Sequence, residues 1–154
     1  MKGSILDTTL IVIALFVLSL FIYIGYILLT NFTGSAIDGE IIQKGIASYS
    51  YFDYLPITMI VSAGIASLIS GYYIKTHPLF FIISVIITIF IVIYSAGVAN
   101  LFLAFADEAV VSTATAEFDL TVWVFQNLPL LILVVLGMGI LGLYVFKNKE
   151  DRGI

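Results

Sequence analysis

Side chains that could do chemistry are few in this sequence of 154 residues. Two acidic pairs, Asp107 with Glu108 and Glu117 with Asp119, have the carboxylate oxygens that a divalent cation requires. Their spacing does not match a calcium-binding loop, so a solvated acidic surface is the better interpretation. His77, the one histidine, could titrate near neutral pH. A place in a tight turn at the membrane surface fits it better.

The composition excludes several classes of chemistry. Cysteine is absent, which removes disulfides, thiolate catalysis and cysteine-based metal sites. No Ser/His/Asp set, phosphate-binding loop or dinucleotide motif occurs, and no basic stripe is interleaved with aromatic residues. We therefore expect no enzyme activity, no cofactor, no metal site and no nucleic-acid partner.

The six basic and ten acidic residues leave long parts of the chain without any charge. These uncharged stretches are 8–37, 54–74, 76–106 and 120–146. The chain is 62% hydrophobic with a mean hydropathy of +1.19, whereas soluble domains are roughly 45–50% apolar. A bilayer crossing needs about 20 apolar residues, which each stretch can supply. The sequence therefore predicts an integral membrane protein with a single domain, 1–154.

The predicted fold is all-α, a polytopic transmembrane bundle of four spans that form two helical hairpins. The spans are expected at about 9–30, 56–74, 79–105 and either 121–146 or 129–146. Asp53 lies near the cap of the second span. In the fourth, Pro129 either kinks a long helix or starts a short one with Asn127 as its cap. We favour the short helix, which leaves 107–127 as an interfacial segment with Trp123 at headgroup depth.

Basic residues lie mainly on one side of this arrangement. That side carries Lys2, Lys75, Lys147, Lys149 and Arg152. The other side carries Lys44 alone, so the positive-inside rule places both termini on the cytoplasmic or inner side of a cell or virion membrane. The outer loops, 31–54 and 106–119, then carry most of the acidic residues.

The first outer loop is predicted to contain a short interfacial helix. Its apolar residues recur at roughly helical spacing, with polar residues between them, at Ile37, Ile41, Ile42 and Ile46. An aromatic belt typical of a membrane interface follows at Tyr49, Tyr51, Phe52 and Tyr54.

The two halves of the chain share an order of features: helix, Asn, outer loop, Leu-Pro, helix, Lys. These markers are Asn31, Leu55-Pro56 and Lys75 in the first half, and Asn100, Leu128-Pro129 and Lys147 in the second. A parallel repeat of two hairpins would produce this order. So would the cap, break and basic stop that any transmembrane hairpin needs, and both interpretations stay open.

Small residues give the most specific internal signal. Two rows repeat every four positions along the second span, Ala63, Ser67 and Gly71 in one and Ser62, Ala66 and Ser70 in the other. Such rows let helices approach closely, and serines can hydrogen-bond across the contact. The rows either pack against the chain's own helices, which we favour, or form a dimerisation face or a narrow polar pore.

Four further residues are candidates for helix contacts. Gly137, Gly139 and Gly142 in the fourth span are expected at places of close packing. Asn100 is the main polar side chain near the outer part of the third span, where it is expected to hydrogen-bond between helices.

Turn and cap residues give about 50–147 a resemblance to a known group. They are Phe52-Asp53-Tyr54, Ser70-Gly71-Tyr72, His77-Pro78, Asn100-Leu101-Phe102, Phe118 and Asn127-Leu128-Pro129. In these residues the chain resembles small uncharacterised multi-span membrane proteins of archaeal and bacterial viruses and mobile elements. The resemblance implies a virion membrane protein, or a membrane protein used in assembly or exit.

These observations favour a non-enzymatic structural or assembly component of a membrane. Its expected partners are the lipid bilayer and either further copies of the chain in a homo-oligomer or other membrane proteins. The alternatives are an accessory subunit of a larger membrane complex and a pore or holin-like channel that uses Ser62, Ser70 and Asn100. A coupled transporter ranks last, because almost no ionisable group is expected at membrane depth.

Overall fold

The computed structural model describes residues 3–31, 39–73, 78–109 and 111–150. All regular elements in these ranges are helices, so the all-α prediction is confirmed. The long helices are α1 (Gly3–Asn31), α3 (Leu55–Tyr73), α4 (Pro78–Ala106) and α7 (Leu128–Glu150). The short ones are α2 (Gly39–Tyr49), the 3-10 helix η2 (Ser50–Tyr54), α5 (Ser112–Thr115) and α6 (Asp119–Gln126).

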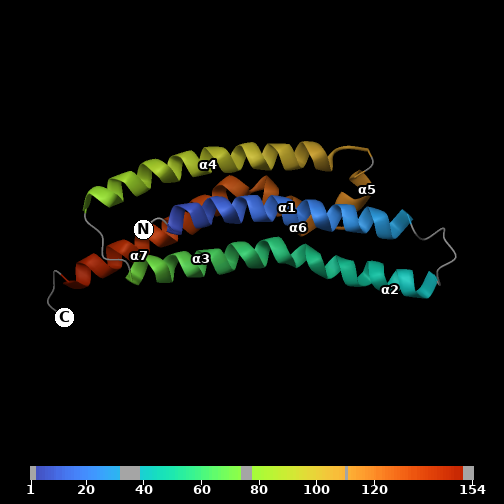
Figure 1. Ribbon diagram of the computed structural model, residues 1–154, viewed down its shortest axis with the longest axis horizontal. Coiled ribbons are helices and arrows are strands. Elements are labelled where there is room, and N and C mark those ends of the chain that lie inside the picture. Colours follow the sequence, from blue (N-terminus) through green and yellow to red (C-terminus); the bar gives the residue numbers. More distant parts are fainter. Residues whose placement is uncertain (1–2, 32–38, 74–77, 110, 151–154) are drawn as a thin grey trace.

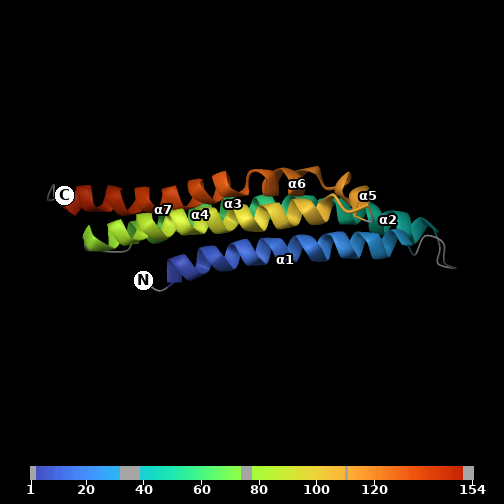
Figure 2. The same ribbon diagram turned by 90° about the horizontal axis from the view of Figure 1, so that it is seen from above.

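The four long helices lie side by side in an elongated bundle (Figure 1, Figure 2). α1 and α4 run in one direction along its axis, and α3 and α7 run in the other. The most extensive packing joins α3 to α7, followed by α4 to α7. The tightest pair therefore comes from different predicted hairpins, and the contact between α1 and α3 within the first hairpin is thinner.

Apolar side chains fill the interior of the bundle and also cover its outside. The fully buried core side chains include Val12, Leu15, Phe102, Phe125, Leu128 and Ile132. Large apolar side chains are also exposed on every long helix, among them Phe21, Ile65, Phe90 and Leu130. In water such a surface would be unfavourable, whereas in lipid it is the expected exterior.

Three helical segments in the described part of the chain are long and apolar enough to cross a membrane. They are Thr9–Asn31, Gln43–Gly71 and Ile82–Ala106. A fourth is added if α6 and α7 count as one broken span. The helices are therefore compatible with an integral membrane protein of the predicted kind.

The structure has a helix in the first outer loop, but its orientation differs from the prediction. We expected an interfacial helix, which lies in the plane of the membrane surface, whereas α2 runs along the bundle axis in line with α3 (Figure 1, Figure 2). Two glycines explain the close lengthwise packing on α1. A Cβ at Gly25 would collide with the hydroxyl of Tyr49, and one at Gly45 would lie 3.3 Å from a methyl group of Leu29.

The predicted fourth span is broken at Asn127. α6 and α7 meet there at an angle of 70°, with Pro129 in the first turn of α7, where a proline costs little. Asn127 directly precedes α7, as expected of its cap, and its carbonyl oxygen accepts the N–H of Leu131 over 2.9 Å. Its side-chain amide bonds at the end of α6 instead, where it donates to the carbonyl oxygen of Trp123 over 2.9 Å.

Candidate functional site

A buried carboxylate joins the two outer segments of the chain. Asp53 in η2 is 8% exposed, and one of its oxygens, Oδ2, accepts a hydrogen bond from the backbone N–H of Leu120 over 3.0 Å. The other, Oδ1, accepts from the backbone N–H of Thr121 over 2.7 Å and from the Thr121 hydroxyl over 2.8 Å. The Asp53 junction, defined by these three residues, therefore connects positions 67 and 68 residues apart.

The Asp53 junction is a helix cap supplied from a distant part of the chain. α6 begins at Asp119, so the N–H groups of Leu120 and Thr121 are among those that a helix leaves without an internal acceptor. Phe118, the residue before the helix, makes no capping bond with its side chain. The carboxylate of Asp53 fills this role, and its negative charge also lies favourably at the positive end of the helix dipole.

Our placement of Asp53 near the cap of the second span described its position in sequence but not its bonds. The ion pair that the structure records among the described residues is elsewhere, between Lys44 and Glu40 on the exposed surface of α2. The charge of Asp53 is thus compensated by hydrogen-bond donors of α6, a strong arrangement for a buried carboxylate. We expected almost no ionisable group at membrane depth, and the buried carboxylate of Asp53 lies beside the start of α3, at the edge of that span.

An aromatic cluster lies around the start of α6. The ring of Tyr23 on α1 contacts those of Phe118 and Phe102, with centroids 5.3 and 5.5 Å apart. Phe102 on α4 stacks on Phe125 of α6 with centroids 3.7 Å apart. Phe118, whose ring contacts Tyr23, lies three residues before Thr121, so the aromatic cluster and the Asp53 junction are neighbours. Together they connect α1, α4 and α6 at one end of the bundle.

Two fully buried hydroxyl groups on α1 have no hydrogen-bond partner within the described part of the chain. They belong to Ser19 and Tyr23, one helical turn apart. A buried hydroxyl without a partner destabilises a fold, by about 1–3 kcal/mol in mutational data.

We expect the Tyr23→Phe variant to gain about 1 kcal/mol in free energy of unfolding, because it removes only the unpartnered hydroxyl and keeps the ring contacts. Denaturant unfolding in detergent micelles would measure the change. Tyr26→Phe on the same helix, where the side chain is half-buried, is the matched control and should change stability less. A loss of stability in Tyr23→Phe would contradict the absence of a partner.

The predicted small-residue rows of α3 divide between two surfaces. Ser67 packs against α7, where a Cβ added at Gly139 would lie 2.5 Å from its hydroxyl oxygen. Gly64, which the sequence reasoning did not select, lies one turn earlier, and a Cβ there would be 3.2 Å from the sulfur of Met138. The α3–α7 seam, defined by these four residues, places part of the small-residue row in contact within the chain.

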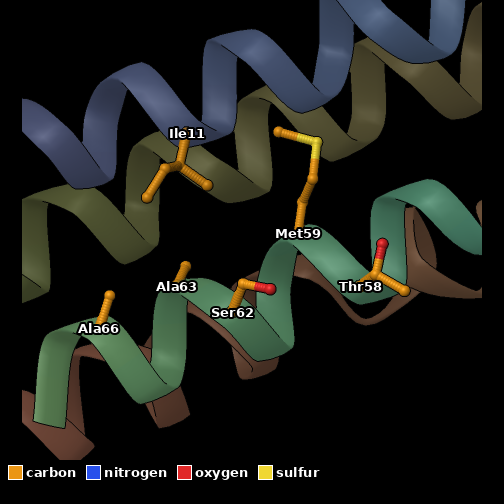
Figure 3. Close-up of a pocket in the computed structure, with 6 residues that line it drawn as sticks. All are labelled: Ile11, Thr58, Met59, Ser62, Ala63 and Ala66. Carbon is orange, nitrogen blue, oxygen red and sulfur yellow. The ribbon is translucent and has the colours of Figure 1, made fainter.

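The second part of the rows lines a groove between α1 and α3. Ser62, Ala63 and Ala66 border it together with Ile11, Thr58 and Met59 (Figure 3). The groove is open and has a volume of about 380 Å³. It offers no acid or base, and the Thr58 hydroxyl already donates to the carbonyl oxygen of Leu55 over 2.8 Å. The groove is therefore a mainly apolar depression whose six lining residues include no ionisable side chain.

The remaining candidates do not form a common site. Gly71 and Gly142 are buried and Ser70 is half-buried. Asn100 is exposed and is not among the residues that line the groove. A Cβ at Gly137 would have no other atom within 4 Å, so this glycine marks no close approach.

The acidic residues do not assemble into a metal site. Asp107, Glu108, Glu117 and Asp119 are all exposed, and no group of three or more His, Cys, Asp or Glu side chains gathers in the described ranges. His77 lies outside the described residues. The polar side chains described above thus have roles in hydrogen bonding and packing.

No protein-family model, curated protein or solved structure matches the chain. The fold and the site define its class, a bundle of apolar helices in which a buried carboxylate holds a bent helix pair to the start of α3.

Proposed function

We propose that the chain is an integral membrane protein of four spans that serves as a non-enzymatic structural or assembly component of a cell or virion membrane. One observation carries the proposal: the buried polar bonds at the Asp53 junction hold helices together, while the outer surfaces of all the long helices are apolar. A protein built for catalysis or coupled transport would need a buried ionisable group left free for substrate. Asp53 instead has both carboxylate oxygens bonded to α6.

The orientation is part of the proposal. Both termini lie on the inner side, together with the basic residues after α3 and those near the C-terminal end of α7, and the end of the bundle with α2 and α5 lies on the outer side. The exposed acids Asp107, Glu108, Glu117 and Asp119 are then all on the outer side, which is consistent with the distribution of basic residues.

A structural component of a membrane acts through contacts with its own copies or with other membrane proteins. We expect native mass spectrometry, on protein released gently from its own membrane, to find it in such complexes. As a control, isotope-labelled protein is added after solubilisation. Labelled copies in the complexes would show that they formed in detergent.

A strict monomer without bound proteins would contradict the proposal.

Reconstitution in planar bilayers provides a second measurement, in which we expect a flat current trace. A steady conductance would favour the pore instead, and association with a large enzyme or translocation complex would favour the accessory subunit.

A further inference from the structure

Two spans begin at the same height in the bundle. α3 starts at Leu55, two residues after Asp53, and α6 starts where Asp53 caps it. Because α6 makes an angle of 70° with α7, it runs largely across the bundle, and Leu128 stays near the height of Thr121. α3 and α7 therefore both begin beside the Asp53 junction.

The lengths of these two helices match a bilayer. α3 has 19 residues, which corresponds to about 28 Å at the rise of an α-helix. The uncharged part of α7, residues 128–146, gives the same length of about 28 Å. The hydrocarbon core of a typical bilayer is about 30 Å thick, so both helices cross it if its outer edge lies at the Asp53 junction.

Exposed aromatic side chains surround the Asp53 junction at this height. Tyr51 is 75% exposed, Tyr54 is 57% exposed and Trp123 is 46% exposed. They flank Asp53 and Thr121, which are buried, so the same two segments turn polar groups inward and aromatic groups outward. Tyrosine and tryptophan are enriched at this level of membrane proteins, because their rings are apolar and their polar atoms hydrogen-bond in the headgroup layer.

α1 and α2 extend past this height. Tyr23 contacts Phe118 just before α6, and residues 24–31 continue α1 for about a further 12 Å. Figure 1 and Figure 2 show the end of α1 and α2 beyond the ends of α4 and α6. The exposed ion pair of Lys44 with Glu40, 2.7 Å apart, lies on this projecting part.

We propose that the three exposed aromatic side chains of Tyr51, Tyr54 and Trp123 bind the headgroup and glycerol layer of phospholipids and mark the outer edge of the hydrocarbon core. The end of α1, together with α2, then lies outside the hydrocarbon core as a projecting hairpin. The segment Gln43–Gly71, apolar enough to cross as one span, crosses only with the part that belongs to α3. This inference rests on the membrane insertion proposed above.

Trp123 is the one tryptophan of the chain, so its fluorescence reports on one site. The protein is reconstituted in phosphatidylcholine vesicles that carry bromine either near the glycerol or near the end of the acyl chain. We expect the shallow bromine to quench the emission several-fold more than the deep one. Stronger quenching by the deep bromine would overturn the inference, and quenching by neither would also overturn membrane insertion. Trp123→Phe is the blank.

The absence of cysteine permits a second measurement with single-cysteine variants. Ser48→Cys on α2 and Ile65→Cys on α3 are matched, because both side chains are exposed in the structure. A water-soluble maleimide, present before the vesicles are sealed so that it reaches both sides, should label position 48 several-fold faster than position 65. Denatured protein should label equally at both positions.

The outcomes of the labelling distinguish the two proposals. Equal and fast labelling of positions 48 and 65 in vesicles would overturn membrane insertion, and with it the proposed function. Protection of both positions would overturn the projecting hairpin while leaving membrane insertion intact.

Discussion

Replacing Asp53 by alanine is expected to lower the free energy of unfolding by about 3 kcal/mol. The change leaves the N–H groups of Leu120 and Thr121 and the Thr121 hydroxyl without their acceptor in a site that is 8% exposed. Hydrogen bonds to a charged group contribute about 1.5–3 kcal/mol each, and water that enters the vacated space offsets part of the loss. Denaturant unfolding in detergent micelles, followed by the fluorescence of Trp123 on α6, measures the effect.

Asp119→Ala is the matched control for this variant. Its carboxylate is in the first turn of the same helix, but it is exposed. Its loss should cost no more than about 0.5 kcal/mol, the size of a screened interaction with the helix dipole. Asp53→Asn retains one acceptor oxygen and should fall between the two. Equal effects of Asp53→Ala and Asp119→Ala would show that the junction does not hold α6.

Removing the Thr121 hydroxyl tests the side-chain hydrogen bond of the Asp53 junction separately from its two backbone hydrogen bonds. Thr121→Val keeps the shape and the backbone N–H and removes one hydrogen bond, so we expect a loss of about 1.5 kcal/mol, at the lower end for a hydrogen bond to a charged group. Combined with Asp53→Ala it should add little, because the acceptor is already gone. A double-mutant cycle with additive effects would contradict direct contact between the two side chains.

The sequence predicted those features that depend on local pattern. Charge spacing marked apolar segments that the structure forms as α1, α3 and α4. The length and apolar composition of such a segment can be found from the local sequence, without knowing which helices pack against it. Pro129 indicated the break before α7 for the same reason, since its ring and its missing N–H disturb only the preceding turn of a helix.

The Asp53 junction could not be predicted in this way, because it joins residues far apart in sequence. One signal was present: Phe118 precedes a helix start but has no side chain able to cap it, so the cap had to come from elsewhere. Which acid supplies it depends on how α3 and α6 pack. The orientation of α2 was missed for a similar reason, since the contact of Tyr49 with Gly25 exists only in the folded chain.

The buried carboxylate changes how the charge distribution is interpreted. In the sequence, Asp53 is one of several acids in the outer loops, with a place near the cap of the second span. In the structure Glu117 and Asp119 are exposed while Asp53 is buried and bonded. Its position near the end of the bundle also lets the charge stay close to the polar headgroup layer proposed above, where burial costs less than at the centre of the bilayer.

Replacing Gly139 by leucine is expected to lower the free energy of unfolding by about 2–3 kcal/mol, because the added carbons overlap α3 at the closest point of the α3–α7 seam. A Cβ at this position would already lie 3.6 Å from the carbonyl oxygen of Ser67 and 3.8 Å from its Cβ, so the rest of a leucine has no free space. Gly139→Ala should cost far less, because the Ser67 hydroxyl, its nearest contact, can rotate away.

Gly137→Leu, two residues earlier on α7, is the control, because a Cβ there meets no atom within 4 Å. It should change stability by no more than about 0.5 kcal/mol, as for other substitutions without new contacts. Ser67→Gly should restore part of the stability lost in Gly139→Leu, since it removes the side chain that the leucine meets. Equal losses at 137 and 139, or no rescue by Ser67→Gly, would mean that α3 and α7 do not meet at this seam. A rescue would show that Ser67, the member of the small-residue rows at this seam, sets how closely these two parallel helices approach.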